Sequence, residues 1–291
     1  MTLEQKYFIA VIECLGTDFA GFIGIGRESK IDCECRTRRR EICAFSIDNN
    51  TKLMYNGGII MKKTNENKVW MDREDYINYL SVKTNEVHIS DHNSKTGPLC
   101  NDLAFPVCTC REDAPCRNGG CYCMKGRQQI AVVQAAYTRN LRLYNTDPVD
   151  FWEQVKFKIK HRPYPLFRWT DCGDIPDADF FVGMVDLAKT FTDIKFLAYT
   201  KKYWIVNEWI DKNGDLPDNL TIRFSAWHIG WKVENPHNLP VAYVDFKDKT
   251  LNPEFPNGTT GCPNQKDKTI TCSICRKCFN KKIQSVKFDQ H

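Results

Sequence analysis

The chain lacks the features that mark several common classes of protein. No stretch approaches the ~18 apolar residues of a membrane-spanning helix. Met1 to Lys6 lacks the basic start of a secretory signal, and no clear small-residue cleavage site follows the apolar stretch Tyr7 to Cys14. A Walker loop, a dinucleotide-binding glycine motif, a nucleophile elbow and a paired-histidine zinc motif are all missing. These absences argue against membrane or secreted proteins and against nucleotide hydrolases, dinucleotide enzymes, serine hydrolases and zincins.

The net charge is also small. Lysine and arginine exceed aspartate and glutamate by 41 − 36 = 5, and Arg38-Arg39-Arg40 is the basic run that stands out. Such a balance permits a nucleic-acid partner without supporting one. The hydrophobic fraction of 42% and the aromatic fraction of 12% are those of an ordinary folded protein. We therefore expect a folded, cytoplasmic protein with no membrane partner.

Cysteine, by contrast, is abundant. Fifteen of the 291 residues are cysteine, a share of about 5% that exceeds ordinary usage but falls short of a disulfide-rich scaffold. In a reducing cytosol, clustered cysteines are more often metal ligands than disulfides. We therefore predict a cysteine-ligated metal protein, in which an iron–sulfur cluster is favoured over zinc.

The first 60 residues differ in pattern from the rest of the chain. A glycine-punctuated apolar stretch, Phe8 to Gly26, is followed by three closely spaced cysteines, and periodicity is weak throughout. One interpretation is a small module with its own thiols. The other is that translation begins at Met61. Gly57-Gly58 can be encoded by a ribosome-binding sequence a few bases upstream, and Met61 is followed by two lysines, a typical polar start.

From about residue 86 onward, strand and helix patterns alternate, which is typical of βα units and a parallel sheet. We predict an α/β fold, a partial (β/α) barrel of about six mostly parallel strands, with an open doubly wound sheet as the alternative. The expected domains are the extension 1–60, a core 61–250 containing a cysteine-rich loop 100–123, and a metal-bound appendage 251–291. The expected strands are Leu166–Thr170, Ile194–Tyr199, Leu220–Ala226 and Val241–Phe246, and the expected helices are Gln128–Tyr144, Val149–Ile159, Asp177–Phe191 and Trp204–Ile210.

Six cysteines lie between residues 100 and 123, separated by turn-forming residues. A loop rich in glycine, proline and asparagine can fold several thiolates around one centre. Zinc would take four ligands, whereas a four-iron cluster takes up to four and can leave one iron open. The spacing of Cys116, Cys121 and Cys123 does not match the C-x3-C-x2-C motif of radical SAM enzymes. A structural metal site without chemistry is the simpler alternative.

The second cluster is a C-x2-C-x2-C motif near the C-terminus. Three thiolates at this spacing can hold one face of a cubane, as in bacterial ferredoxins, with a fourth cysteine from elsewhere. The same four could bind zinc. The motif therefore predicts a metal site and leaves the metal open, with a slight preference for iron–sulfur. Its predicted ligands are Cys262, Cys272, Cys275 and Cys278.

Acidic residues crowd the turn after the strand Leu166–Thr170. Asp171 and Asp174 flank Cys172 and Gly173, and Asp177 follows. Crowded like charges are costly without a ligand, so Asp171 and Asp174 are candidate catalytic residues. In the simpler alternative, Asp177 caps the next helix while the other two acids face solvent. Lys201-Lys202 follows a later strand, where a solvated charged turn is a simpler interpretation than contact with a phosphate or a substrate carboxylate.

A set of short segments from about residue 85 onward carries a family resemblance: Asn93 to Pro98, Thr109 to Arg111, Ala114 to Cys116, Cys121-Tyr122, Arg168-Trp169, Gly173 to Pro176, Lys201 to Glu208, Phe224 to Trp227 and Asn235 to Pro240. Together they resemble the phage gene product 88 domain family, found in phages and in bacterial genomes that carry phage genes. The resemblance implies a bacterial host or infected cell, and it does not cover residues 1–60. The chain departs from the family pattern at Cys123 and Cys172, where alanine and serine are common. The resemblance thus implies that the ligands of the first cluster are Cys110, Cys116 and Cys121.

The layout also resembles a divergent radical SAM core, an analogy at the level of the fold. In that superfamily a Gly-Gly-Glu turn holds the amino group of the cofactor, and Cys172-Gly173-Asp174 could stand in for it. Gly173, Asp174 and Ser225 are therefore candidate contacts to S-adenosylmethionine. The leading hypothesis is a phage-type [4Fe–4S] protein with a radical-SAM-like activity on an unidentified substrate. The alternative is a non-enzymatic zinc protein with a structural or nucleic-acid-binding role.

Overall fold

The structure, a computed structural model, describes residues 73–118 and 120–290 together with four two-residue strands nearer the N-terminus. The hypothesis that translation begins at Met61 falls outside the described residues. The four short strands pair antiparallel, β1 with β4 and β2 with β3. They are β1 (Ala44–Phe45), β2 (Tyr55–Asn56), β3 (Ile59–Ile60) and β4 (Val69–Trp70).

A seven-stranded sheet, parallel at every pairing, organises the described part of the chain. Because β5 to β9 follow one another across the sheet without a reversal of order, their crossovers fall on one face. The sheet is open, with β5 and β10 at its edges, and the predicted α/β fold is confirmed. The order is β10 (Thr260–Gly261), β11 (Ser285–Asp289), β9 (Val241–Asp245), β8 (Leu220–Ser225), β7 (Lys195–Thr200), β6 (Leu166–Trp169) and β5 (Cys100–Leu103).

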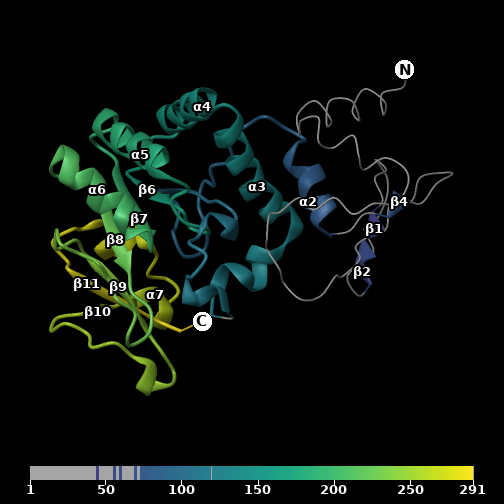
Figure 1. The fold of residues 1–291 in the computed structure, drawn as a ribbon. Coiled ribbons are helices and arrows are strands. Elements are labelled where there is room, and N and C mark those ends of the chain that lie inside the picture. The colour runs from purple at the N-terminus through teal and green to yellow at the C-terminus, as the bar shows by residue number, and fades with distance from the viewer. Residues whose placement is uncertain are drawn as a thin grey trace.

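Helices α4, α5 and α6 cover one face of this sheet (Figure 1). Alternate strand residues point toward them and form the main core, in which Phe167, Phe196 and Phe224 are fully buried. Asp177 caps α5 by accepting the backbone N–H of Phe180 at 2.8 Å, which confirms its expected capping role. The helices are α2 (Arg73–Ser81), α3 (Ala131–Thr146), α4 (Pro148–His161), α5 (Ala178–Thr190), α6 (Tyr203–Asn213), α7 (Pro263–Lys266) and α8 (Cys272–Cys275). Each of these helices in the described part of the chain is too short or too polar to cross a membrane.

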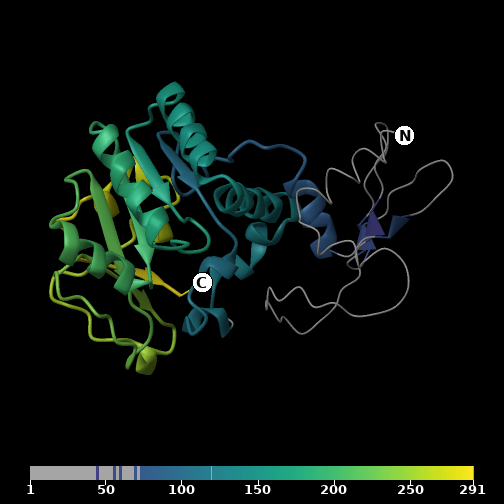
Figure 2. The ribbon, with the colours of Figure 1, turned by 45° about the horizontal axis from the view of Figure 1, so that its top comes forward.

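The opposite face of the sheet is covered by the C-terminal segment, residues 260–289, which is yellow in Figure 2. Leu166, Leu197 and Phe279 form a small buried cluster there together with Cys100. Thr221 on β8 donates its hydroxyl to the carbonyl of Phe279 at 3.0 Å. Polar strand residues therefore hold the cysteine-rich segment against this face of the sheet.

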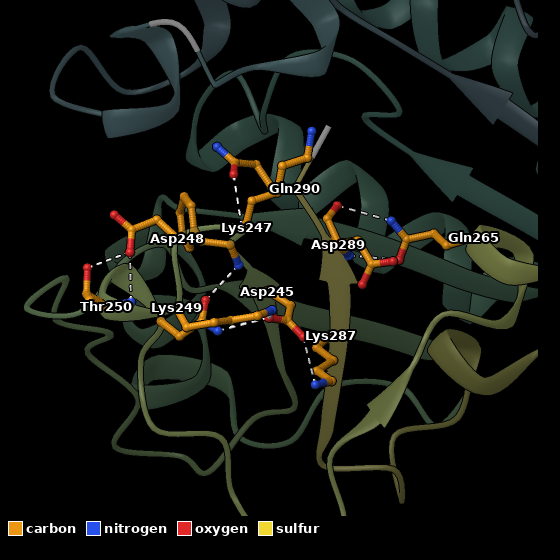
Figure 3. Close-up of polar contacts among 11 residues, drawn as sticks. Asp245, Lys247, Asp248, Lys249, Thr250, Gln265, Lys287, Asp289 and Gln290 are labelled. Carbon is orange, nitrogen blue, oxygen red and sulfur yellow. Dashed lines mark hydrogen bonds and ion pairs between the residues drawn. The ribbon is translucent and has the colours of Figure 1, made fainter.

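The C-terminal segment also supplies two strands of the sheet. At the end of β9, the carboxylate of Asp245 accepts from Lys249 at 2.5 Å and from Lys287 on β11 at 2.8 Å (Figure 3). These two ammonium groups hold the pKa of Asp245 below its usual range. Gln265, in α7, exchanges two hydrogen bonds with the backbone of Asp289 at the end of β11. The segment is thus continuous with the sheet, a connection that the sequence pattern did not predict.

Candidate functional site

A cavity of about 200 Å³ lies between the cysteine-rich loop and the C-terminal segment. Residues that end β6, β7 and β8 or follow them directly line it, so it lies at the carboxyl ends of the parallel strands. This is where ligands bind in parallel α/β folds. All seven cysteines predicted as metal ligands line this cavity, together with Cys123: Cys110, Cys116, Cys121, Cys262, Cys272, Cys275 and Cys278.

The first set of thiols comes from the loop after β5, which folds as short 3₁₀ turns. Cys116 and Cys121 share a hydrogen bond. The thiol of Cys123 forms further hydrogen bonds, one with Cys121 and one with Cys172. The hydrogen bond with Cys121, together with burial, raises the pKa of Cys116. Burial, with the charge of nearby Asp174, raises the pKa of Cys110. Cys123 and Cys172, which the family resemblance did not imply as ligands, thus lie in the same thiol cluster.

The second set is held by the loop that precedes β5. The backbone N–H groups of Cys272 and Ser273 donate to the carbonyls of Lys95 and Thr96, each at 2.9 Å. Burial raises the pKa of Cys272 to about 11, against the opposing charges of Arg168 and Lys95. The loop of residues 93–98, singled out by its family resemblance, therefore anchors the C-terminal cysteine motif. Fully buried Cys100 packs with this second set.

Cationic side chains accompany both sets of thiols. Lys95, Arg168 and Lys201 line the cavity, and Arg223 lies fully buried beneath Cys278. Arg223 donates to four carbonyls of the segment 277–283. No carboxylate among the described residues forms an ion pair with it. A buried charge without a counter-charge is costly, so a negatively charged group close to Arg223 would stabilise the structure.

The two candidate catalytic acids, Asp171 and Asp174, are buried, so the simpler alternative in which they face solvent is wrong. Asp171 forms an ion pair with Arg168 at 2.8 Å. The carboxylate of Asp174 accepts the backbone N–H groups of Ile175 at 2.7 Å and Lys201 at 3.0 Å. Asp174 therefore joins the turn after β6 to the end of β7, and it also lines the cavity.

The other two predicted cofactor contacts, Gly173 and Ser225, line the cavity as well. Gly173 adopts a positive φ of 78°. A Cβ at this position would lie 2.7 Å from the carbonyl oxygen of Phe105. Gly173 thus allows the turn to pack closely against the start of the cysteine loop. Ser225 accepts a hydrogen bond from the ammonium of Lys201 at 3.0 Å.

A third buried acid, Asp102, lies opposite Arg168 in the register of β5 and β6. Burial, followed by the negative charge of Asp171, raises the pKa of Asp102 to about 7, while Arg168 and a hydrogen bond from Asn93 act in the opposite direction. The carboxyl of Asp102 is therefore protonated in the folded protein at pH values where it is ionised in the unfolded chain.

This shift predicts a pH dependence of stability. A carboxyl with a raised pKa contributes stability that is fully present below about pH 4 and is lost as the pH rises through about 7. Asp102→Asn removes that loss. The stability advantage of Asp102→Asn over the wild type should therefore grow by about 1 kcal/mol per pH unit between pH 5 and 7, and level off above that range. Urea unfolding at a series of pH values measures it, and a constant difference across the range would contradict the prediction.

The thiols line one cavity, but they do not have the geometry of metal ligands. Across residues 73–118 and 120–290, no three cysteine, histidine, aspartate or glutamate side chains have the arrangement needed to hold a metal ion. The chemistry of the donors nevertheless fits a thiolate-bound metal, because two sets of cysteines share one cavity and cations lie beside each set. Cys108 is exposed and does not line the cavity.

The sequence reasoning did not identify the cations of the site. Arg168 and Arg223 are single charged residues within otherwise apolar or small-residue strands, a pattern that marks a buried charge with a specific role. Lys95 has no such local signal, since its position depends on packing against the C-terminal segment. Lys201 was interpreted as part of a solvated turn, but it is half-buried and lines the cavity.

Fold and site together define an α/β protein with a thiol-lined cavity at the carboxyl ends of its parallel strands. The family model described as gene product 88 matches residues 79–281. The chain therefore belongs to the gene product 88 family, as its sequence motifs indicated. No curated protein and no solved structure matches the chain.

Proposed function

We propose that this gene product 88 protein binds metal at two thiolate-ligated centres that share one cavity. The first centre uses Cys110, Cys116 and Cys121. The second uses Cys262, Cys272, Cys275 and Cys278. The observation that carries the proposal is that all seven cysteines, from two distant parts of the sequence, line a single cavity at the carboxyl ends of the strands.

The charges around the cavity support this proposal. Four thiolates around a divalent metal, or around a four-iron cluster, carry a net negative charge. Lys95 and Arg168 lie beside Cys272, and Arg223 donates to the backbone carbonyl of Cys278 at 2.8 Å. These cations would offset the charge of the second centre. Apolar contacts alone do not explain why buried arginines face the cysteine segment.

The cysteine spacing favours iron–sulfur clusters over zinc. The C-x2-C-x2-C motif with a remote fourth cysteine matches the ligand pattern of bacterial ferredoxins. Three ligands in the first set suit a four-iron cluster with one open iron better than a closed zinc site. An iron–sulfur cluster supplies one-electron redox chemistry when bound. Zinc at the same thiols is the second candidate, because C-x2-C pairs bind it equally well.

A radical-SAM-like reaction would need an acid to hold the amino group of S-adenosylmethionine. The acid expected in this role, Asp174, already accepts two backbone N–H groups, which better supports a positioning role for it. Gly173 and Ser225 line the cavity beside it. Binding of S-adenosylmethionine is therefore tested separately from the two metal centres, by adding it to the purified protein.

Metal analysis of the anaerobically purified protein tests the proposal. We expect roughly four or eight irons per chain with matching sulfide and a broad absorbance band near ~400 nm. Cys272→Ser combined with Cys278→Ser should remove the metal of the second centre, and Cys110→Ser combined with Cys116→Ser that of the first. Cys108→Ser is the matched control, because Cys108 is exposed and lies outside the cavity lining.

The possible results separate the candidates. Stoichiometric zinc without iron would overturn the iron–sulfur assignment and keep the thiolate centres. Metal content that neither double variant lowers would overturn the centres themselves. A spectral change on adding S-adenosylmethionine, lost in the Cys110→Ser and Cys116→Ser double variant, would add an enzymatic role at the first centre.

A further inference from the structure

The ends of β7 and β8 place three polar or aromatic side chains together in the cavity. The ammonium of Lys201 donates to the hydroxyl of Ser225 at 3.0 Å and lies 5.4 Å from the ring centroid of Trp227. All three residues line the cavity. This arrangement combines one positive charge, one hydroxyl and one aromatic ring at one end of the site.

The charge of Lys201 has no carboxylate bound to it. No described carboxylate forms an ion pair with its ammonium. Asp174, in the turn after β6, accepts the backbone N–H groups of Lys201 and Ile175, and the Lys201 charge acts on it without an ion pair. Ser225 accepts a hydrogen bond from one of the three N–H groups of the ammonium. The ammonium therefore keeps the capacity to bind an anionic group.

A strained residue supports a binding role for the same cavity. Thr170, directly after β6, lines the cavity with a φ of 49°, in the left-handed region that β-branched residues avoid. Its hydroxyl is buried without a hydrogen-bond partner. Arg168, which also lines the cavity, has an unpartnered buried Nε. Strain and unsatisfied polar atoms of this kind concentrate at functional sites.

We propose that this end of the cavity binds a small organic anion. Lys201 and Ser225 hold its carboxylate or phosphate group, and its flat apolar body packs against Trp227. Pockets that combine apolar walls with a few convergent polar groups are typical ligand sites. The proposal goes beyond the metal centres and holds whichever metal they bind, since none of these three side chains is a proposed metal ligand.

Titration calorimetry of the full chain, as purified and again after chelation, tests the proposal. The probes are benzoate and phenyl phosphate for the two kinds of anion, with benzyl alcohol as the neutral control. We expect at least one anion to bind about tenfold more tightly than benzyl alcohol, because a charge-assisted hydrogen bond contributes on this scale. Lys201→Met should remove that advantage and Lys201→Arg should largely keep it. Lys202→Met is the matched control, because Lys202 lies outside the cavity lining and donates to the carbonyl of Pro176.

Each outcome decides the proposal. A preference for phenyl phosphate or for benzoate that is lost only in Lys201→Met, with metal content unchanged, supports it and identifies the anion. Equal binding of anions and benzyl alcohol overturns it. Loss of metal in Lys201→Met with anion binding retained also overturns it, because Lys201 then serves the first centre as a counter-charge. Anion binding by a chain that holds no metal as purified anaerobically, before any chelation, would refute the metal centres and leave the anion site standing.

Discussion

Replacing Arg223 by methionine is expected to release the C-terminal cysteine segment and to lower the free energy of unfolding by about 3–5 kcal/mol. Arg223 is fully buried on β8 and donates to the carbonyls of Cys278, Ile283 and Asn280 at 2.8–3.0 Å, and to that of Lys277 at 3.2 Å. Methionine fills similar space but removes the donor of the Cys278 and Ile283 carbonyls, whereas the carbonyls of Lys277 and Asn280 still accept the backbone N–H groups of Asn280 and Ile283. Urea unfolding measures the loss of stability, and metal analysis should show the second centre depleted while the first is kept.

Two further variants separate the charge of Arg223 from its hydrogen bonds. Arg223→Lys keeps the charge with fewer donors and should fall between the wild type and Arg223→Met. Lys282→Met changes an exposed cation on the same segment and should change stability by less than about 0.5 kcal/mol. An Arg223→Met protein that unfolds like the wild type and keeps its second centre would show that the segment is held by other contacts.

The central fold could be predicted because its signals are local. Strands β6 to β9 are apolar runs of the expected length, and the helices between them have helical periodicity with recognisable caps. The final strand, β11, was missed because Ser285 to Asp289 mixes polar and apolar residues in only five positions. Its pairing with β9 depends on contacts such as Asp245 with Lys287, which no local pattern indicates.

The candidate site could be predicted only in part, for a similar reason. Cysteine spacing identified both thiol sets, because ligands of one metal are often close in sequence. That the two sets share a cavity follows from the docking of the C-terminal segment on Arg223 and on the loop of residues 93–98. Both contacts join residues far apart in the chain. The role of Asp174 was predicted from its neighbours in sequence, whereas one of its hydrogen bonds comes from the backbone of Lys201, directly after the next strand.

Gly173→Ala is expected to destabilise the protein by about 2–4 kcal/mol, combining left-handed backbone strain with a steric clash. Gly173 has a φ of 78°, and an added Cβ would lie 2.7 Å and 2.9 Å from the carbonyl oxygens of Phe105 and Pro106. It would also lie 2.6 Å from the hydroxyl of Thr109, which accepts the backbone N–H of Asp174. Since backbone atoms cannot rotate away, the start of the cysteine loop must shift, and Cys110 with it.

A matched control isolates the steric part of this effect. Gly214 has a φ of 83° and a ψ of −155°, and a Cβ added there would meet no atom within 4 Å, so Gly214→Ala carries only the backbone strain, about 1–3 kcal/mol. The excess loss in Gly173→Ala then measures the close packing of the turn against the loop. Because that loop carries the proposed first centre, metal analysis should show the first centre depleted and the second one kept. Equal destabilisation by the two substitutions, with both centres retained, would mean that the loop shifts at little energetic cost and that Gly173 does not position Cys110.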